Sequence, residues 1–177
     1  IDCVDIIRDT ARYDAYLERT QDFNKFYVKT GFDELDELIG GWDRLEEYAT
    51  IVARPGVGKS WVLLRCAMSA AEQGLRAGLY SGEMSETKVG YRFDTLAGHI
   101  SNSGIIHGNS ELMNNYKAFL DSMESRFTGS LKVITPKMIK HSATVTDLEA
   151  FIEKEKLDIL FIDQHSLMED QRKAKDP

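Results

Sequence analysis

Residues 51–60, with the sequence IVARPGVGKS, constrain the fold of this chain more than any other segment. An apolar run leads into a loop of glycine and proline, and Lys-Ser then opens a helical pattern. In a strand, loop and helix in this order, backbone N–H groups surround an anion and the helix N-terminus adds its partial positive charge. The segment therefore predicts a phosphate-binding loop.

Each residue type in this loop suits a nucleotide. Lys59 would reach the β- and γ-phosphates, and the Ser60 hydroxyl would bind Mg²⁺. Gly56 and Gly58 allow positive φ and a close backbone approach. The usual motif has glycine where this chain has Ala53, so a plain glycine-rich turn with a surface lysine is the alternative. The residues expected to contact the nucleotide are Arg54, Pro55, Gly56, Val57, Gly58, Lys59, Ser60 and Trp61.

Two carboxylates follow other predicted strands. Asp163 ends the apolar run 157–162, where it would hold Mg²⁺ together with Ser60. Glu83 follows the predicted strand 77–81, where it would act as the catalytic base for the attacking water. An alternative role for Glu83 is a favourable charge at the N-terminus of the next helix.

Apolar runs alternate with helical patterns along most of the chain. Continuous apolar strands between helices predict an α/β fold, with a mainly parallel sheet covered by helices on both faces. Residues 101–109 are expected to form a loop. The expected strands are 48–53, 77–81, 131–134 and 157–163, and the expected helices are 59–73, 86–99, 110–126 and 144–156. The last of these helices opens with Thr144-Val145-Thr146-Asp147, which resembles a capping box.

A separate segment precedes this core. Residues 1–20 have the apolar spacing of a helix, and residues 21–29 connect it to a domain spanning 30–177. The apolar stripe of the first helix would pack either on its own domain or on a neighbouring subunit. A short amphipathic helix over 32–39 is expected to end at Gly40-Gly41.

Composition excludes several classes of protein. No apolar run is long enough to span a membrane, and no signal peptide is visible, so a cytoplasmic location is expected. Cys3 and Cys66 give no disulfide framework, and Cys66 is expected to be a buried thiol. The net charge of -7 argues against a broad basic surface for duplex DNA, but it allows a narrow basic channel.

Several motifs together resemble the replicative DNA helicases of the DnaB family, a hexameric branch of the RecA-like P-loop NTPases. Thr30-Gly31-Phe32 is similar to that family's entry segment, and Ala53-Arg54-Pro55 before Gly58-Lys59-Ser60 is similar to its phosphate loop. Ser81-Gly82-Glu83-Met84-Ser85 resembles its Ser-Leu-Glu-Met-Ser. The segment from Asp163 to Met168 resembles its Asp-Tyr-Leu-Gln-Leu-Met, with Gln164, His165 and Ser166 departing from it.

The resemblance implies an ATP-hydrolysing motor that couples turnover to translocation on single-stranded DNA and to unwinding. It implies ATP and Mg²⁺ as cofactors, a ring of six copies, and a primase or helicase loader as further partners. It also favours docking of the first helix on the adjacent subunit. The family's arginine finger lies beyond the third strand, so we expect the chain to be a truncated copy that lacks it.

Three alternatives stay open. Ser81-Gly82-Glu83 also resembles the RadA branch of recombination and repair ATPases. An accessory module that binds nucleotide without cycling, and a kinase-like enzyme for a small substrate, would share the same loop. Unwinding of a forked duplex would separate the helicase from the RadA branch, and ATP turnover would separate both from a non-cycling module.

Overall fold

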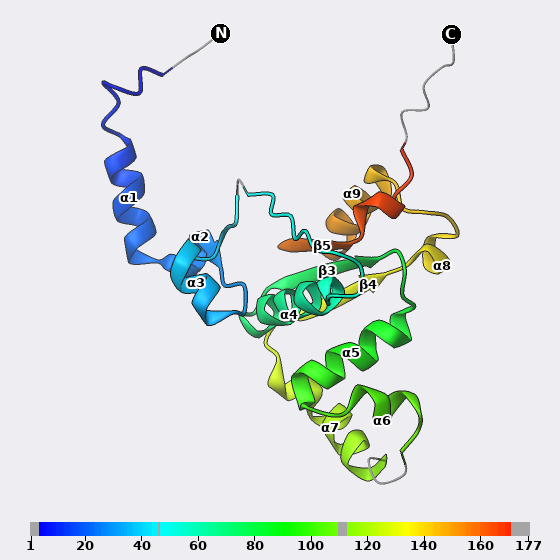
Figure 1. Cartoon of the computed structure of the whole chain (residues 1–177). Coiled ribbons are helices and arrows are strands. Elements are labelled where there is room, and N and C mark those ends of the chain that lie inside the picture. The colour runs from blue at the N-terminus through cyan, green and yellow to red at the C-terminus, as the bar shows by residue number, and fades with distance from the viewer. Residues whose placement is uncertain (1–3, 46, 110–112, 171–177) are drawn as a thin grey trace, which may run out of the picture.

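The computed structural model describes residues 4–45, 47–109 and 113–170. A three-stranded parallel sheet in the order β4-β3-β5 forms the centre, and a two-stranded antiparallel ribbon lies before it (Figure 1). The strands are β1 (Tyr27–Val28), β2 (Trp42–Asp43), β3 (Arg76–Ser81), β4 (Ser130–Ile134) and β5 (Ile159–Asp163). The helices are α1 (Arg12–Gln21), α2 (Phe23–Phe26), α3 (Asp33–Ile39), α4 (Lys59–Glu72), α5 (Glu86–Gly98), α6 (Asn102–Ile106), α7 (Met113–Arg126), α8 (Pro136–Ile139) and α9 (Val145–Glu155), with a 3-10 turn at His165–Leu167.

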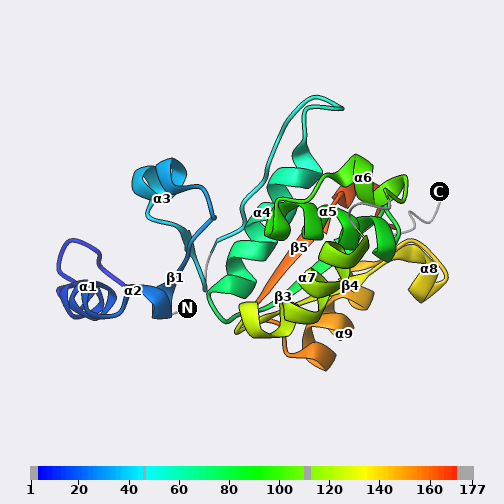
Figure 2. The same ribbon diagram turned by 90° about the horizontal axis from the view of Figure 1, so that it is seen from below.

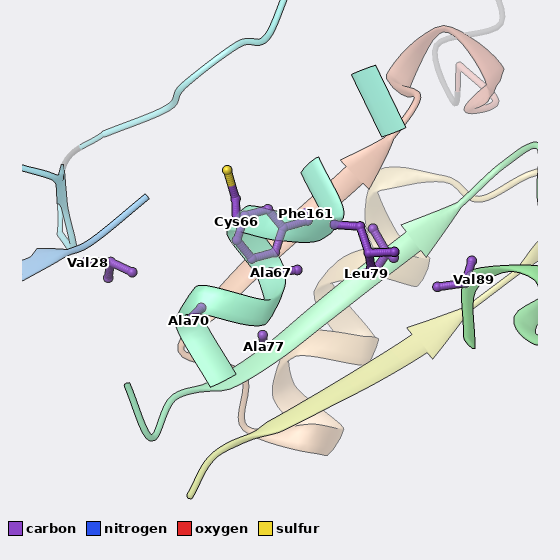
Figure 3. Packing of buried hydrophobic residues seen from close by; sticks show 9 residues of the cluster. Val28, Cys66, Ala67, Ala70, Ala77, Leu79, Val89 and Phe161 are labelled. Atoms are coloured by element: carbon purple, nitrogen blue, oxygen red, sulfur yellow. The ribbon is translucent and has the colours of Figure 1, made fainter. Parts of the chain in front are cut away.

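Helices cover both faces of the central sheet, as the sequence predicts. Side chains alternate along β3, so that Ala77 and Leu79 face α4 whereas Tyr80 packs against Leu148 of α9. Figure 3 shows the ring of Phe161 on β5 among the alanines of α4. Viewed from below, α4 and α9 lie on opposite sides of the strands (Figure 2). The predicted α/β fold is therefore confirmed.

The predicted helix over 59–73 is observed as α4, which contributes Leu64, Cys66, Ala67 and Ala70 to the hydrophobic core between this helix and the sheet. Ala67 and Ala70 in the middle of α4 are completely buried, because their small side chains let the helix approach the sheet closely. Cys66 is 1% exposed, so the expected buried thiol is confirmed, and burial raises its pKa to about 11.

The predicted strand over 48–53 is wrong. Residues 47–54 have no regular secondary structure, and Val52 is 87% exposed, whereas a central parallel strand would be buried. The edge of β5 that faces this segment is separated from it by a cavity of about 530 Å³. A short apolar run guarantees neither burial nor a hydrogen-bonded partner, which is why the sequence pattern alone overstates the strand here.

The segment before the core is more structured than expected. α1 begins at Arg12 rather than near residue 1, and residues 1–3 lie outside the described part of the chain. Residues 21–29, expected to be a plain connection, contain α2 and β1. Arg19 of α1 pairs with Asp43 of β2 at 2.7 Å, which ties the helix to the ribbon. The short helix over 32–39 is confirmed as α3, with Gly40 at φ +75° as its cap.

The remaining elements match the expectations closely, except that α6 and α8 were not expected. The expected loop over 101–109 contains α6, which Ser101 caps by accepting a hydrogen bond from the Gly104 N–H. The helix expected over 110–126 is observed as α7 from residue 113, and residues 110–112 lie outside the described part. Thr144 and Asp147 form the predicted capping box at the start of α9.

Candidate nucleotide-binding site

The predicted phosphate loop forms an open turn at the N-terminus of α4. Gly58 caps the helix at φ +101° and Gly56 has φ +79°, a region that side chains other than glycine rarely adopt. An added Cβ at either glycine would meet no atom within 4 Å. The glycines are therefore required by backbone conformation, and the space in front of the loop stays open to a ligand.

Lys59 reaches back across the loop. Its Nζ donates a hydrogen bond to the carbonyl oxygen of Ala53 at 3.2 Å. The ammonium group thus lies over the turn that the loop residues form, next to the backbone N–H groups of the helix start. Arg54, Pro55 and Val57 are exposed, as a loop that receives a ligand from solvent requires.

Trp61 is anchored by the next helix. The guanidinium group of Arg92 on α5 lies over its ring, 5.1 Å from the ring centroid. Ser60, one residue earlier in the first turn of α4, is half-buried. The start of α4 is therefore held against α5, while the loop before it projects into solvent.

The two predicted carboxylates reach the same edge of the sheet. Ser81 and Asp163 are register partners at the ends of β3 and β5, and the Gly82 N–H donates to the Asp163 carbonyl at 2.6 Å. Asp163 is only 7% exposed. Lys59 and Asp163 line the same cavity of about 530 Å³, so the structure brings the loop and the β5 carboxylate together.

Glu83 follows β3 on an exposed turn at this edge. Its Oε1 accepts a hydrogen bond from Nε2 of Gln164 at 2.9 Å. The sequence gives no signal for Gln164 beyond its departure from the family pattern, because the contact spans 81 residues. This residue is a member of the site that motif reasoning does not find.

The donor set fits a magnesium–nucleotide complex. In the described part of the chain, no group of three or more His, Cys, Asp and Glu side chains is placed to hold a metal ion by itself. Mg²⁺ usually binds one or two carboxylates and keeps water and phosphate oxygens as its other ligands. Ser60 and Asp163 carry oxygen atoms of that kind. Asp163 lines the cavity together with Lys59, whereas Ser60 is not among the residues that line it.

Comparison with known proteins identifies the family. The model of the DnaB-like helicase C-terminal domain matches residues 27–176. The chain belongs to this family. The fold of this DnaB-like domain is similar to the solved structure of the ATPase domain of G40P, which superimposes with a TM-score of 0.77 over 99% of the chain at 24% sequence identity.

Shorter stretches of this DnaB-like domain match curated RadA proteins. The DNA repair protein RadA of Mycobacterium tuberculosis (strain H37Rv) is 40% identical over 67 residues, which are 38% of the chain. RadA of Campylobacter jejuni is 37% identical over 73 residues, or 41% of the chain. The chain spans 14% and 16% of these two relatives and 62% of the G40P chain.

Among the described residues, the DnaB-like domain has no helix of the length and hydropathy that crossing a bilayer requires.

Proposed function

We propose that this domain binds ATP with Mg²⁺ and hydrolyses it, and that the hydrolysis drives movement along single-stranded DNA and the unwinding of a duplex. The observation that carries the proposal is the shared cavity of Lys59 and Asp163, with Glu83 at the same edge of the sheet. Membership of the DnaB-like helicase family supports it.

The roles follow from the chemistry of each group. Lys59 and the backbone N–H groups of residues 56–61 compensate the charge on the β- and γ-phosphates, which grows during transfer. Glu83 accepts the proton of the attacking water, whose oxygen bonds to the γ-phosphorus while the bond from the γ-phosphorus to the bridging oxygen breaks. Ser60 and Asp163 would hold Mg²⁺, which would neutralise part of the phosphate charge.

The assembly is also proposed. A ring of six copies around single-stranded DNA, in the bacterial or phage-infected cytoplasm, is the arrangement that we propose, with a primase and a loader as further partners. α1 supports contacts between copies, because none of its residues is buried and the segment 4–21 exposes a series of apolar side chains. These are Val4, Ile6, Ile7, Tyr13, Tyr16 and Leu17.

Lys59→Ala tests the hydrolysis directly. Among the described residues, the only hydrogen bond of the ammonium group is to the Ala53 carbonyl oxygen, so its loss should leave the fold intact and abolish ATP turnover. Lys117→Ala is the matched control, since its side chain is 78% exposed on α7. Full ATP turnover in Lys59→Ala would overturn the proposal, and so would nucleotide binding without any turnover in the wild-type chain.

The RadA matches favour a second candidate, an ATPase of recombination or repair. It would use the same residues for hydrolysis but act on branched DNA. A helicase assay on a forked duplex distinguishes the two: ATP-dependent unwinding supports the replicative motor, and ATP hydrolysis stimulated by branched DNA without unwinding supports the repair ATPase.

A further inference from the structure

The contact between Glu83 and Gln164 joins two turns at the open edge of the sheet. The Gln164 side-chain amide donates to Oε1 of Glu83 at 2.9 Å, and this bond leaves Oε2 of the carboxylate available. Glu83 is exposed and Gln164 is half-buried, so the amide forms the inner partner of the pair.

Both turns are fixed by other bonds. On the β3 side, the Ser81 hydroxyl accepts from the Met84 N–H at 3.2 Å and donates to the Met84 carbonyl at 3.0 Å. On the β5 side, the Gln164 carbonyl accepts from the Leu167 N–H at 3.1 Å. These hydrogen bonds fix the two turns, which is needed if the Glu83 carboxylate is to be held in one orientation.

Gly82 brings the two turns close together. A Cβ at this residue would lie 3.1 Å from the Leu167 side chain and 3.5 Å from the Asp163 carbonyl oxygen. The Gly82 N–H bonds that same carbonyl. Gly82 and Gln164 are both departures from the family pattern, and in the structure they lie in the same small unit that positions Glu83.

We propose that Gln164 is a positioning residue for Glu83, holding the carboxylate so that its second oxygen faces the attacking water. The inference rests on the proposed function, in which Glu83 is the catalytic base. An N–H donor to one carboxylate oxygen restricts the rotation of the group and leaves its second oxygen to face the water. Asp163, His165 and Lys59 line the cavity at this edge of the sheet.

A reaction that depends on a base in one orientation loses rate when the base is free to rotate. Misplacement by about 1 Å costs on the order of 100-fold in rate. Gln164→Leu retains the approximate length of the side chain but removes the donor. In the full chain with ATP, Mg²⁺ and single-stranded DNA, we expect kcat to fall about 10- to 100-fold. The Kd for a non-hydrolysable ATP analogue should stay unchanged if Gln164 acts only through its bond to Glu83.

A double-mutant cycle shows whether Gln164 acts through Glu83. In a Glu83→Gln background the base is already absent, so adding Gln164→Leu should not lower the residual turnover further. Glu149→Gln, an exposed carboxylate on α9, is the control for the charge change, and thermal unfolding checks that each variant folds.

The outcomes separate the inference from the proposed function. If Gln164→Leu hydrolyses ATP at the wild-type rate, the inference is overturned but the proposed function is not. The inference is also overturned if Gln164→Leu lowers ATP turnover equally in the wild-type and Glu83→Gln backgrounds, or if it abolishes binding of the ATP analogue. Gln164 would then act on the fold or on the phosphates. A wild-type chain without turnover overturns the proposed function, and the positioning role fails with it.

Discussion

The guanidinium group of Arg92 lies 5.1 Å from the centre of the Trp61 ring, and this contact joins the first turn of α4 to α5. Trp61 directly follows the proposed Mg²⁺ ligand Ser60. A helix start that carries a phosphate loop needs a fixed support, since catalytic geometry tolerates little displacement. Arg92 provides that support from outside the site.

Arg92→Leu should lower the free energy of unfolding by about 1 kcal/mol, because a cation–π contact contributes about 0.5–2 kcal/mol depending on its exposure. Chemical denaturation monitored by circular dichroism gives the value. Arg8→Leu is the matched control, since its side chain is 88% exposed and its ion pair with Asp5 is a surface pair of small value. Equal stability of Arg92→Leu and the wild type would show that the ring contact contributes nothing.

The Tyr116–Asp94 hydrogen bond should stabilise the α5–α7 pair. The Tyr116 hydroxyl donates to Asp94 at 2.6 Å, and Asp94 is 6% exposed. Tyr116→Phe leaves a buried acceptor without this donor, so the free energy of unfolding should fall by about 1–3 kcal/mol. Tyr13→Phe on α1, where the tyrosine is 63% exposed, should change it little. Thermal unfolding of the two variants makes the comparison.

The same pair gives the stability a defined pH dependence. Burial, followed by the bond to Asp94, raises the pKa of Tyr116 above its usual range. The folded chain therefore keeps this proton where the unfolded chain has lost it, and stability should fall as pH rises above about 10. Burial also raises the pKa of Asp94, so its contribution too is larger at acidic pH and falls as pH rises. Tyr116→Phe should remove the alkaline decline but retain the acidic one.

Substitution by alanine should have opposite effects on stability at Gly78 and at Gly90. A methyl group at Gly78 on β3 would collide with Leu157 and lie 3.0 Å from the Phe151 ring, under α9. Overpacking of this kind costs about 1–3 kcal/mol. Gly90 lies inside α5 with nothing within 4 Å of an added Cβ, so Gly90→Ala should stabilise by about 0.5–1 kcal/mol. Denaturation midpoints that move in the same direction would contradict this packing.

Local signals predicted the parts of the fold that local chemistry determines. The capping box at Thr144 and the glycine stop at Gly40 depend on residues a few positions apart, and both are confirmed. The antiparallel ribbon of β1 and β2 was not predicted, because each strand has two residues and shows no period. α6 was missed because its Asn, Ser and Gly residues are those of loops.

Contacts between distant segments could not be predicted from the sequence. Motifs identified Lys59, Glu83 and Asp163 as candidates, and strand periodicity placed the two carboxylates at one edge of the sheet. Periodicity also predicted a strand at 48–53, which the structure does not contain, because pairing with β5 is a matter of tertiary geometry. The bond from Gln164 to Glu83 depends on strand register across 81 residues, which no local pattern encodes.

The sheet order has a consequence for the synthesis of the protein. β3 is the middle strand, and β5, which supplies Asp163 and leads into Gln164, is translated long after it. With 81 residues between Glu83 and Gln164, a ribosome adding about 5–20 residues per second needs roughly 4–16 s to pass from one to the other. During that interval the nascent chain already holds the predicted phosphate loop but lacks Gln164, the residue that we propose orients Glu83. On this proposal, a growing chain that meets ATP is not yet built to hydrolyse it.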